Sequence, residues 1–98
     1  MSLNEIQSDL ELKQVLWACY EYWQGESCSP DERVICHSWV TGPYEDRFGT
    51  KFHQSRLGRL ATLGFLEPED TAKGGHRRYY KIADPDRVKY LLKEWDMI

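Results

Sequence analysis

The pattern of apolar positions near the start of the chain predicts an amphipathic helix at about residues 9–24. The apolar residues recur every three or four positions and therefore share one helical face: Leu12, Val15, Leu16, Cys19 and Trp23. Ser8 and Glu11 have the spacing of a capping box, in which the serine side chain caps the helix and the glutamate reaches back to it. Gly25 is expected to end the helix.

A second helical region is predicted at about residues 30–48, because Ser-Pro-Asp-Glu at residues 29–32 has the composition of a helix start. Proline lacks a backbone donor and clashes with the preceding turn, so an interruption is expected at Gly42-Pro43. β-branched residues are frequent over residues 34–40, and a strand there is the alternative. We favour the helix because its start signal is good.

A third helix is predicted at about residues 53–63, with Phe52 in the turn before it and Gly64 at its end. One face of this helix carries small and apolar residues, which are expected to face the core: Leu57, Leu60 and Ala61. The opposite face is polar and carries Ser55, Arg59 and Thr62, with Arg56 on the flank.

The rest of the pattern predicts a β-hairpin at about residues 65–82 and a last helix at about residues 85–96. Alternation from His76 to Ile82 is typical of a strand, and we expect Tyr80 on its buried face. Asp84-Pro85 is a helix start, followed by a core stripe of Val88, Leu91, Leu92 and Trp95. The chain is therefore expected to form one mainly α domain over residues 1–98 with a small β-hairpin.

Two stretches resemble known regulators. Ser-Arg-Leu-Gly-Arg-Leu-Ala-Thr-Leu-Gly-Phe-Leu at residues 55–66 resembles the recognition helix and following strand of winged helix-turn-helix domains, and Gly-Gly-His-Arg-Arg-Tyr-Tyr-Lys-Ile at residues 74–82 resembles their wing. PadR-like and MarR-like transcription regulators are the nearest groups. The resemblance implies a third helix in the major groove of double-stranded DNA and a wing on the backbone. The residues expected at DNA are Lys51, His53, Gln54, Ser55, Arg56, Arg59, Lys73, His76, Arg77 and Arg78.

The distribution of charge along the chain fits an anionic partner. Residues 1–46 carry nine acidic and two basic residues, a net charge of −7, whereas residues 47–81 carry three acidic and eight basic residues, a net charge of +5. Such segregation indicates a polyanion-facing half. The acidic total of −3 favours one alternative, a winged-helix module that binds protein. A further alternative, with the same DNA-binding surface, is a DNA-binding accessory factor of a mobile element or replication system.

The sequence offers no catalytic or metal-binding arrangement, so we expect no enzyme, no metal and no cofactor. The three histidines are scattered, and Cys28, Cys36 and His37 lack the paired short spacing of zinc ligands. A redox switch between Cys28 and Cys36 is a lesser alternative. Three cysteines without a CxxC pair, no long apolar run and no signal-peptide pattern lead us to expect a reduced, cytoplasmic protein without membrane contact. No small-molecule effector can be named.

Apolar residues of the first and last helices predict a homodimer. Leu10 and Trp17 lie off the core stripe of the first helix, seven residues apart, and Tyr90 and Trp95 lie on the last helix. Exposed large apolar residues mark interfaces, and helix-turn-helix proteins commonly present two recognition helices to DNA. The alternative is that the last helix covers Leu10 and Trp17 within one monomer.

Overall fold

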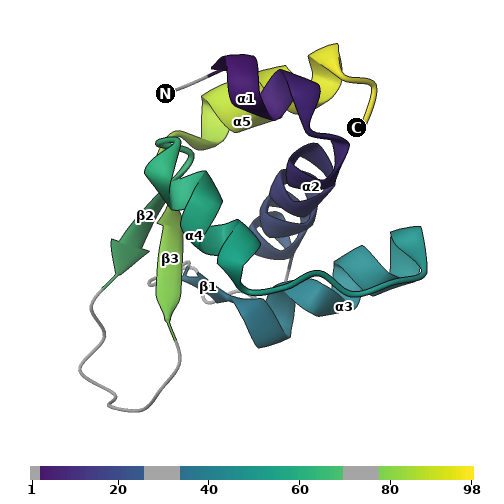
Figure 1. Ribbon diagram of the computed structural model, residues 1–98, viewed down its shortest axis with the longest axis vertical. Helices are drawn as coiled ribbons and strands as arrows, with labels where there is room; N and C mark the ends of the chain where they lie inside the picture. Colours follow the sequence, from purple (N-terminus) through teal and green to yellow (C-terminus); the bar gives the residue numbers. More distant parts are fainter. Residues whose placement is uncertain (1–2, 26–33, 70–77) are drawn as a thin grey trace.

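The computed structural model describes residues 3–25, 34–69 and 78–98, and within them the chain is mainly helical with a small antiparallel sheet (Figure 1). The elements follow in the order α1 (Leu3–Ser8), α2 (Leu10–Gln24), β1 (Ile35–Cys36), α3 (His37–Phe48), α4 (Ser55–Thr62), β2 (Leu66–Glu69), β3 (Tyr79–Ile82) and α5 (Pro85–Glu94). Helix α2 crosses the middle, with α1 and α5 at one end and α3 at the other. It packs against all four other described helices and against β1 and β3.

The sheet has the strand order β1-β3-β2, and both pairings are antiparallel. Strand β3 is central: Tyr80 pairs with Ile35 on one side and with Pro68 on the other. Strands β2 and β3 form the expected hairpin, and their connection lies outside the described residues. The hairpin therefore belongs to a larger sheet, whose third strand arrives from between α2 and α3 (Figure 1).

Strand β1 corrects the helix predicted to run from about residue 30, because Ile35 and Cys36 are extended and pair with β3. The alternative strand is right for these two residues and wrong for residues 37–40, which are helical. Backbone bonds to β3 and full burial of Ile35 outweigh the local helix signal. The predicted start signal at residues 29–32 lies outside the described residues.

Helix α3 also contradicts the interruption predicted at Gly42-Pro43, because it runs unbroken from His37 to Phe48 with Pro43 inside. A proline removes one backbone donor from the helix. Here Val40 and Tyr44, on either side of the proline, are both buried in the core and hold the two turns in line. The helix ends at Gly49, whose φ of 73° is left-handed.

Helix α2 agrees with the range predicted for the first helix, but its cap does not. The Asp9 carboxylate accepts the backbone N–H of Leu12 at 3.1 Å, and Ser8 instead donates to the Glu5 carbonyl at 3.0 Å. Ser8 is occupied in this way because it ends α1, a short helix that the sequence pattern did not predict. Ile6 anchors α1 by complete burial.

The remaining helices agree closely with the sequence pattern. Helix α4 buries Leu57 and Leu60, and Gly64 just beyond it has a left-handed φ of 91°. Helix α5 begins at Pro85 and is capped by the Asp84 carboxylate, which accepts the Arg87 N–H at 3.2 Å. It ends at Glu94, two residues before the predicted end at about residue 96.

The core fills the space between α2, the sheet and the helices around them. Its largest fully buried side chain is Phe65, which lies between α4 and β2. Cys19 of α2 is also fully buried, and this desolvation raises the pKa of its thiol far above the ordinary value. None of the described helices combines the length and apolar composition that a membrane crossing requires.

Candidate functional site

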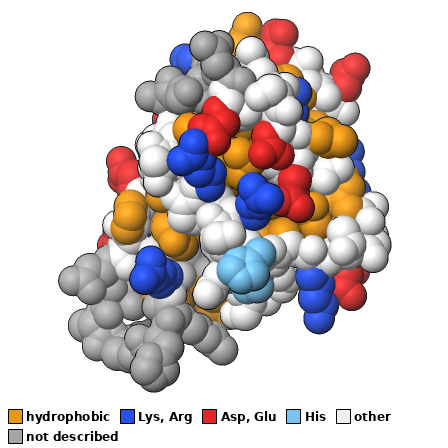
Figure 2. All heavy atoms as spheres, in the orientation of Figure 1, with side chains coloured by type: hydrophobic (Ala, Val, Ile, Leu, Met, Phe, Trp, Pro, Cys, Tyr) orange, Lys and Arg blue, Asp and Glu red, His pale blue; other side chains and the backbone are white. Residues whose placement is uncertain are grey.

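A cleft of about 590 Å³ opens where the N-terminal ends of α3 and α4 meet strand β3. Figure 2 views the molecule from the side on which α4 lies in front, with a histidine side chain near the centre and paired basic and acidic side chains above it. The cleft is lined mainly by polar side chains: Cys36, His37, Ser38, His53, Gln54, Ser55, Leu57, Gly58, Arg78 and Tyr80. Four of these, His53, Gln54, Ser55 and Arg78, belong to the set that the sequence places at DNA.

The start of α4 supplies three of the lining side chains. The His53 Nδ1 atom accepts the backbone N–H of Ser55 at 3.1 Å and lies 2.9 Å from its hydroxyl oxygen. His53 therefore caps the helix in place of the N-cap residue Gln54, whose side chain makes no capping bond. Gln54 is exposed, and its amide remains available to a ligand as both donor and acceptor.

The start of α3 is tied to the turn before α4 through His37. The His37 Nε2 atom lies 2.6 Å from the Phe52 carbonyl oxygen. Because a carbonyl only accepts, this nitrogen carries the proton. The imidazole also packs edge-on against the Phe52 ring, with 5.0 Å between ring centroids. These contacts join the start of α3 to the turn that precedes α4.

Sequence reasoning missed His37 and Ser38 as members of this site. His37 was considered only as a metal ligand, and Ser38 was not singled out. The missed signal is the start of α3 at residue 37, which the prediction of a helix from about residue 30 obscured. Within the described residues, no group of three histidine, cysteine or acidic side chains could hold a metal ion, and Cys28 lies outside them.

Strand β3 forms the opposite wall. Arg78, immediately before the strand, is exposed, and Tyr80 is 6% exposed on the core side as expected. The Tyr80 hydroxyl lies 3.9 Å from the position that a Cβ atom would take at Gly58. The other wing residues expected at DNA, Lys73, His76 and Arg77, lie outside the described residues.

Arg56 and Arg59 lie outside the cleft and are engaged by carboxylates from the start of the chain. Arg59 forms a bidentate pair with the Glu5 carboxylate: Nε donates to Oε1 at 2.7 Å, and Nη2 donates to Oε2. Arg56 forms an ion pair through Nε with Glu11, and its Nη1 lies 3.9 Å from Asp9. Both guanidinium groups are thus already paired on the flank of α4.

Two more basic residues have acidic neighbours. Lys51, expected at DNA, lies 4.0 Å from Glu45, and Lys81 of β3 lies 3.4 Å from Glu69. All four side chains are substantially exposed, where such pairs contribute at most about 1 kcal/mol. The positive charge around Lys51 and Lys81 is consequently reduced, although both side chains remain exposed to solvent.

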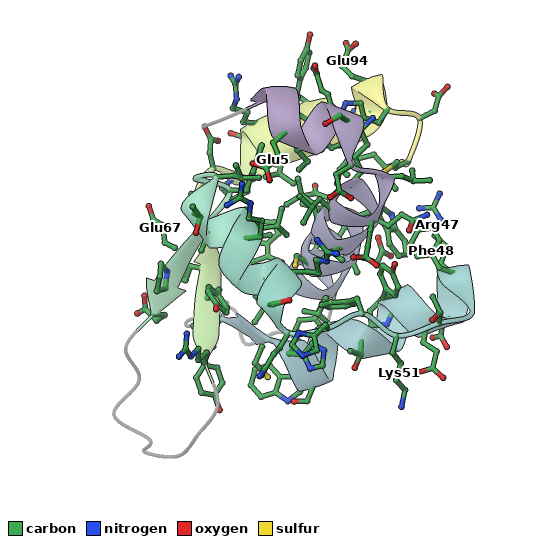
Figure 3. The ribbon with its side chains drawn as sticks, in the orientation of Figure 1. Glu5, Arg47, Phe48, Lys51, Glu67 and Glu94 are labelled. Atoms are coloured by element: carbon green, nitrogen blue, oxygen red, sulfur yellow. The ribbon has the colours of Figure 1, made fainter. Side chains whose placement is uncertain are left out.

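The residues expected at a dimer interface differ in their surroundings. Leu10 and Tyr90 are 66% and 61% exposed. Trp17 instead packs edge-on against Phe48 at 5.7 Å, with the Arg47 guanidinium 4.4 Å from the centroid of its indole. Figure 3 shows Arg47 and Phe48 together beside α2. Trp95 has the Lys13 ammonium 5.1 Å from its ring centroid.

Comparisons with known proteins add no family to this description: no family model matches the sequence, no curated protein is significantly similar to it, and no solved structure matches it significantly.

Proposed function

We propose that this domain is a winged helix-turn-helix transcription regulator that binds double-stranded DNA in a sequence-specific manner. Helix α4 would lie in the major groove, and the β2–β3 hairpin would lie along the backbone as the wing. The order α2-β1-α3-α4-β2-β3, with β1 added to the hairpin, is consistent with winged-helix topology. The observation that carries the proposal is the cleft, where α3, α4 and β3 bring polar side chains from distant parts of the chain together.

The side chains of the cleft suit the two kinds of contact that a DNA site needs. The Gln54 amide can form a bidentate pair with adenine in the major groove. Ser38 carries a hydroxyl group that can donate to a phosphate oxygen, and the start of α4 adds the positive end of its helix dipole. Arg78 is an exposed cation on the wall formed by the hairpin. Base reading is thereby assigned to the beginning of α4 rather than to Arg59, which is paired with Glu5.

The test is selection of bound sequences from random duplex DNA, followed by affinity measurements on the selected duplex. Gln54→Ala is expected to cost about 1–3 kcal/mol and to relax the preference at one base pair. Arg78→Ala should weaken all duplexes similarly and reduce the slope of log affinity against log salt by about 1. Lys93→Ala removes the same charge from α5 and is the control. It should change neither the affinity for DNA nor the slope of log affinity against log salt. Absence of duplex binding by the wild type at low salt would refute the proposal.

A winged-helix module that binds protein is the second candidate. This candidate is favoured by the carboxylates that neighbour four of the basic side chains and offset their positive charge: Lys51, Arg56, Arg59 and Lys81. The salt dependence separates the two functions. A DNA-binding domain loses affinity steeply with salt, whereas a domain whose cleft binds protein shows no such duplex binding at any salt concentration.

A further inference from the structure

We infer that Glu5 and Glu11 are specificity determinants of the proposed DNA site, because they occupy Arg59 and Arg56 and thereby suppress binding to DNA of random sequence. The inference rests on the proposed function and deepens it. It concerns the flank of α4 next to α1 and the start of α2, outside the cleft itself.

The geometry of the two pairs supports occupation of the arginines. Glu5 presents both carboxylate oxygens to Arg59, the fork arrangement that is strongest for a guanidinium. Glu11 forms an ion pair with the Nε atom of Arg56, and the Asp9 carboxylate lies 3.9 Å from a terminal nitrogen of the same side chain. These acids come from α1 and the start of α2, so the fold itself brings them to α4.

Exposure makes these pairs reversible. The side chains of Arg59 and Glu5 are 46% and 37% exposed, and those of Arg56 and Glu11 are 41% and 43% exposed. Water screens pairs at such positions, and each contributes at most about 1 kcal/mol. A DNA phosphate can therefore compete for either arginine, but it must displace a carboxylate and approach another negative charge.

Competition between the carboxylates and DNA phosphates weakens sequence-independent binding more than it weakens base reading. Affinity for random sequence comes almost entirely from basic side chains that neutralise phosphates and release counterions. An arginine held by a carboxylate releases no counterion from DNA until its pair is broken. Gln54 is uncharged and reads a base without these arginines. The two glutamates thus lower the sequence-independent affinity and leave the base-dependent part in place.

The test measures affinity for a random-sequence duplex after Glu5→Gln and after Glu11→Gln. Each variant removes the nearest carboxylate from one arginine, so log affinity should fall more steeply with log salt by about 0.9, equivalent to about tenfold tighter binding near 50 mM salt. Glu94→Gln makes the same charge change at the C-terminal end of α5 (Figure 3). Its affinity for the random-sequence duplex should stay within about twofold of wild type. Equal gains for Glu94→Gln, or no gain for Glu5→Gln and Glu11→Gln, would overturn the inference.

Two further measurements test whether Arg56 causes the gain in affinity and whether the glutamates change specificity. Adding Arg56→Gln to Glu11→Gln removes the freed arginine and should abolish the gain; persistence of the gain would exclude Arg56 as its cause. The ratio of affinities for the selected and the random duplex should fall in Glu5→Gln and Glu11→Gln. A ratio equal to that of wild type would mean that the glutamates weaken all binding alike and do not determine specificity.

Inorganic polyphosphate separates failure of this inference from failure of the proposed function. If no variant binds duplex DNA, the proposed function is wrong. Binding to immobilised polyphosphate still reports whether the arginines are occupied: Glu5→Gln and Glu11→Gln should elute at higher salt than Glu94→Gln, and equal elution would refute the occupation. Thermal unfolding of each variant establishes that it is folded.

Discussion

Gly58 lies in the middle of α4 and lines the cleft, yet no neighbouring group requires a glycine there. The nearest atom to an added Cβ is the Tyr80 hydroxyl at 3.9 Å, an ordinary contact distance. At Gly42 in α3, nothing apart from its chain neighbours lies within 4 Å of an added Cβ, but the next residue is Pro43. Glycine inside a helix is less favourable than alanine by about 1 kcal/mol. In the proposed complex, Gly58 has a function that Gly42 lacks: it allows DNA to approach the helix backbone.

The two glycines make a matched test at the scale of single residues. Gly58→Ala should raise the free energy of unfolding by about 0.5–1 kcal/mol, because alanine restricts the unfolded chain and favours the helix. Gly42→Ala should gain less, because Pro43 disfavours the helical conformation for a preceding residue that carries a Cβ. Urea unfolding measures this gain. Gly58→Ala should also weaken binding to the selected duplex, whereas Gly42→Ala should leave it unchanged. If both variants bind as wild type, close approach of DNA at Gly58 is excluded.

At the scale of elements, the junction of α1 and α2 positions the acids that face α4. Asp9 separates the two helices with an extended backbone, φ −120° and ψ 99°, and caps α2 through its carboxylate. The capping box expected at Ser8 and Glu11 fails because both side chains have other partners. Ser8 donates to the Glu5 carbonyl, and Glu11 pairs with Arg56. A single capping residue therefore sets where α2 begins and where Glu11 stands.

Substitutions at Asp9 distinguish its cap from its charge. Asp9→Ala should lower the free energy of unfolding by about 1 kcal/mol, because the Leu12 N–H loses its acceptor. Asp9→Asn keeps the acceptor and removes the charge near Arg56, so it should remain close to wild type in stability. Urea unfolding of both variants, with Ser8→Ala as the control, measures the difference. A loss for Ser8→Ala as large as that for Asp9→Ala would restore Ser8 as the cap.

Across the whole molecule, local patterns suffice for α2, α4 and α5, since each has an apolar stripe with clear ends. Strand β1 could not be predicted in the same way, because its two residues are defined by pairing with β3 some 45 positions later. Some residues of the cleft could be predicted: the start of α4 and Arg78 follow from the resemblance. His37 and Ser38 could not, because their place in the cleft depends on where α3 begins. Segregation of charge was visible in the sequence, but the pairing of Glu5 with Arg59, 54 positions apart, was not.

Assembly is the last property at this scale, and we propose a two-fold homodimer. One α4 reaches only a few base pairs, and two copies spaced about 34 Å apart would read successive turns of DNA. The described surface offers exposed Leu10 and Tyr90 for such an interface. Trp17 and Trp95 are less suitable targets for substitution, because both already pack within the monomer.

Tyr90→Glu is the sharpest test of that interface, because Tyr90 is 61% exposed and its loss should leave the monomer folded. Burying an unpaired carboxylate in an apolar contact is strongly unfavourable, so the variant should be monomeric where the wild type is dimeric. Sedimentation equilibrium at micromolar concentration measures both. Lys89→Glu, the neighbouring exposed position on α5, is the control for added negative charge and should remain dimeric. A monomeric wild type contradicts the homodimer, and a Tyr90→Glu dimer moves the interface away from α5.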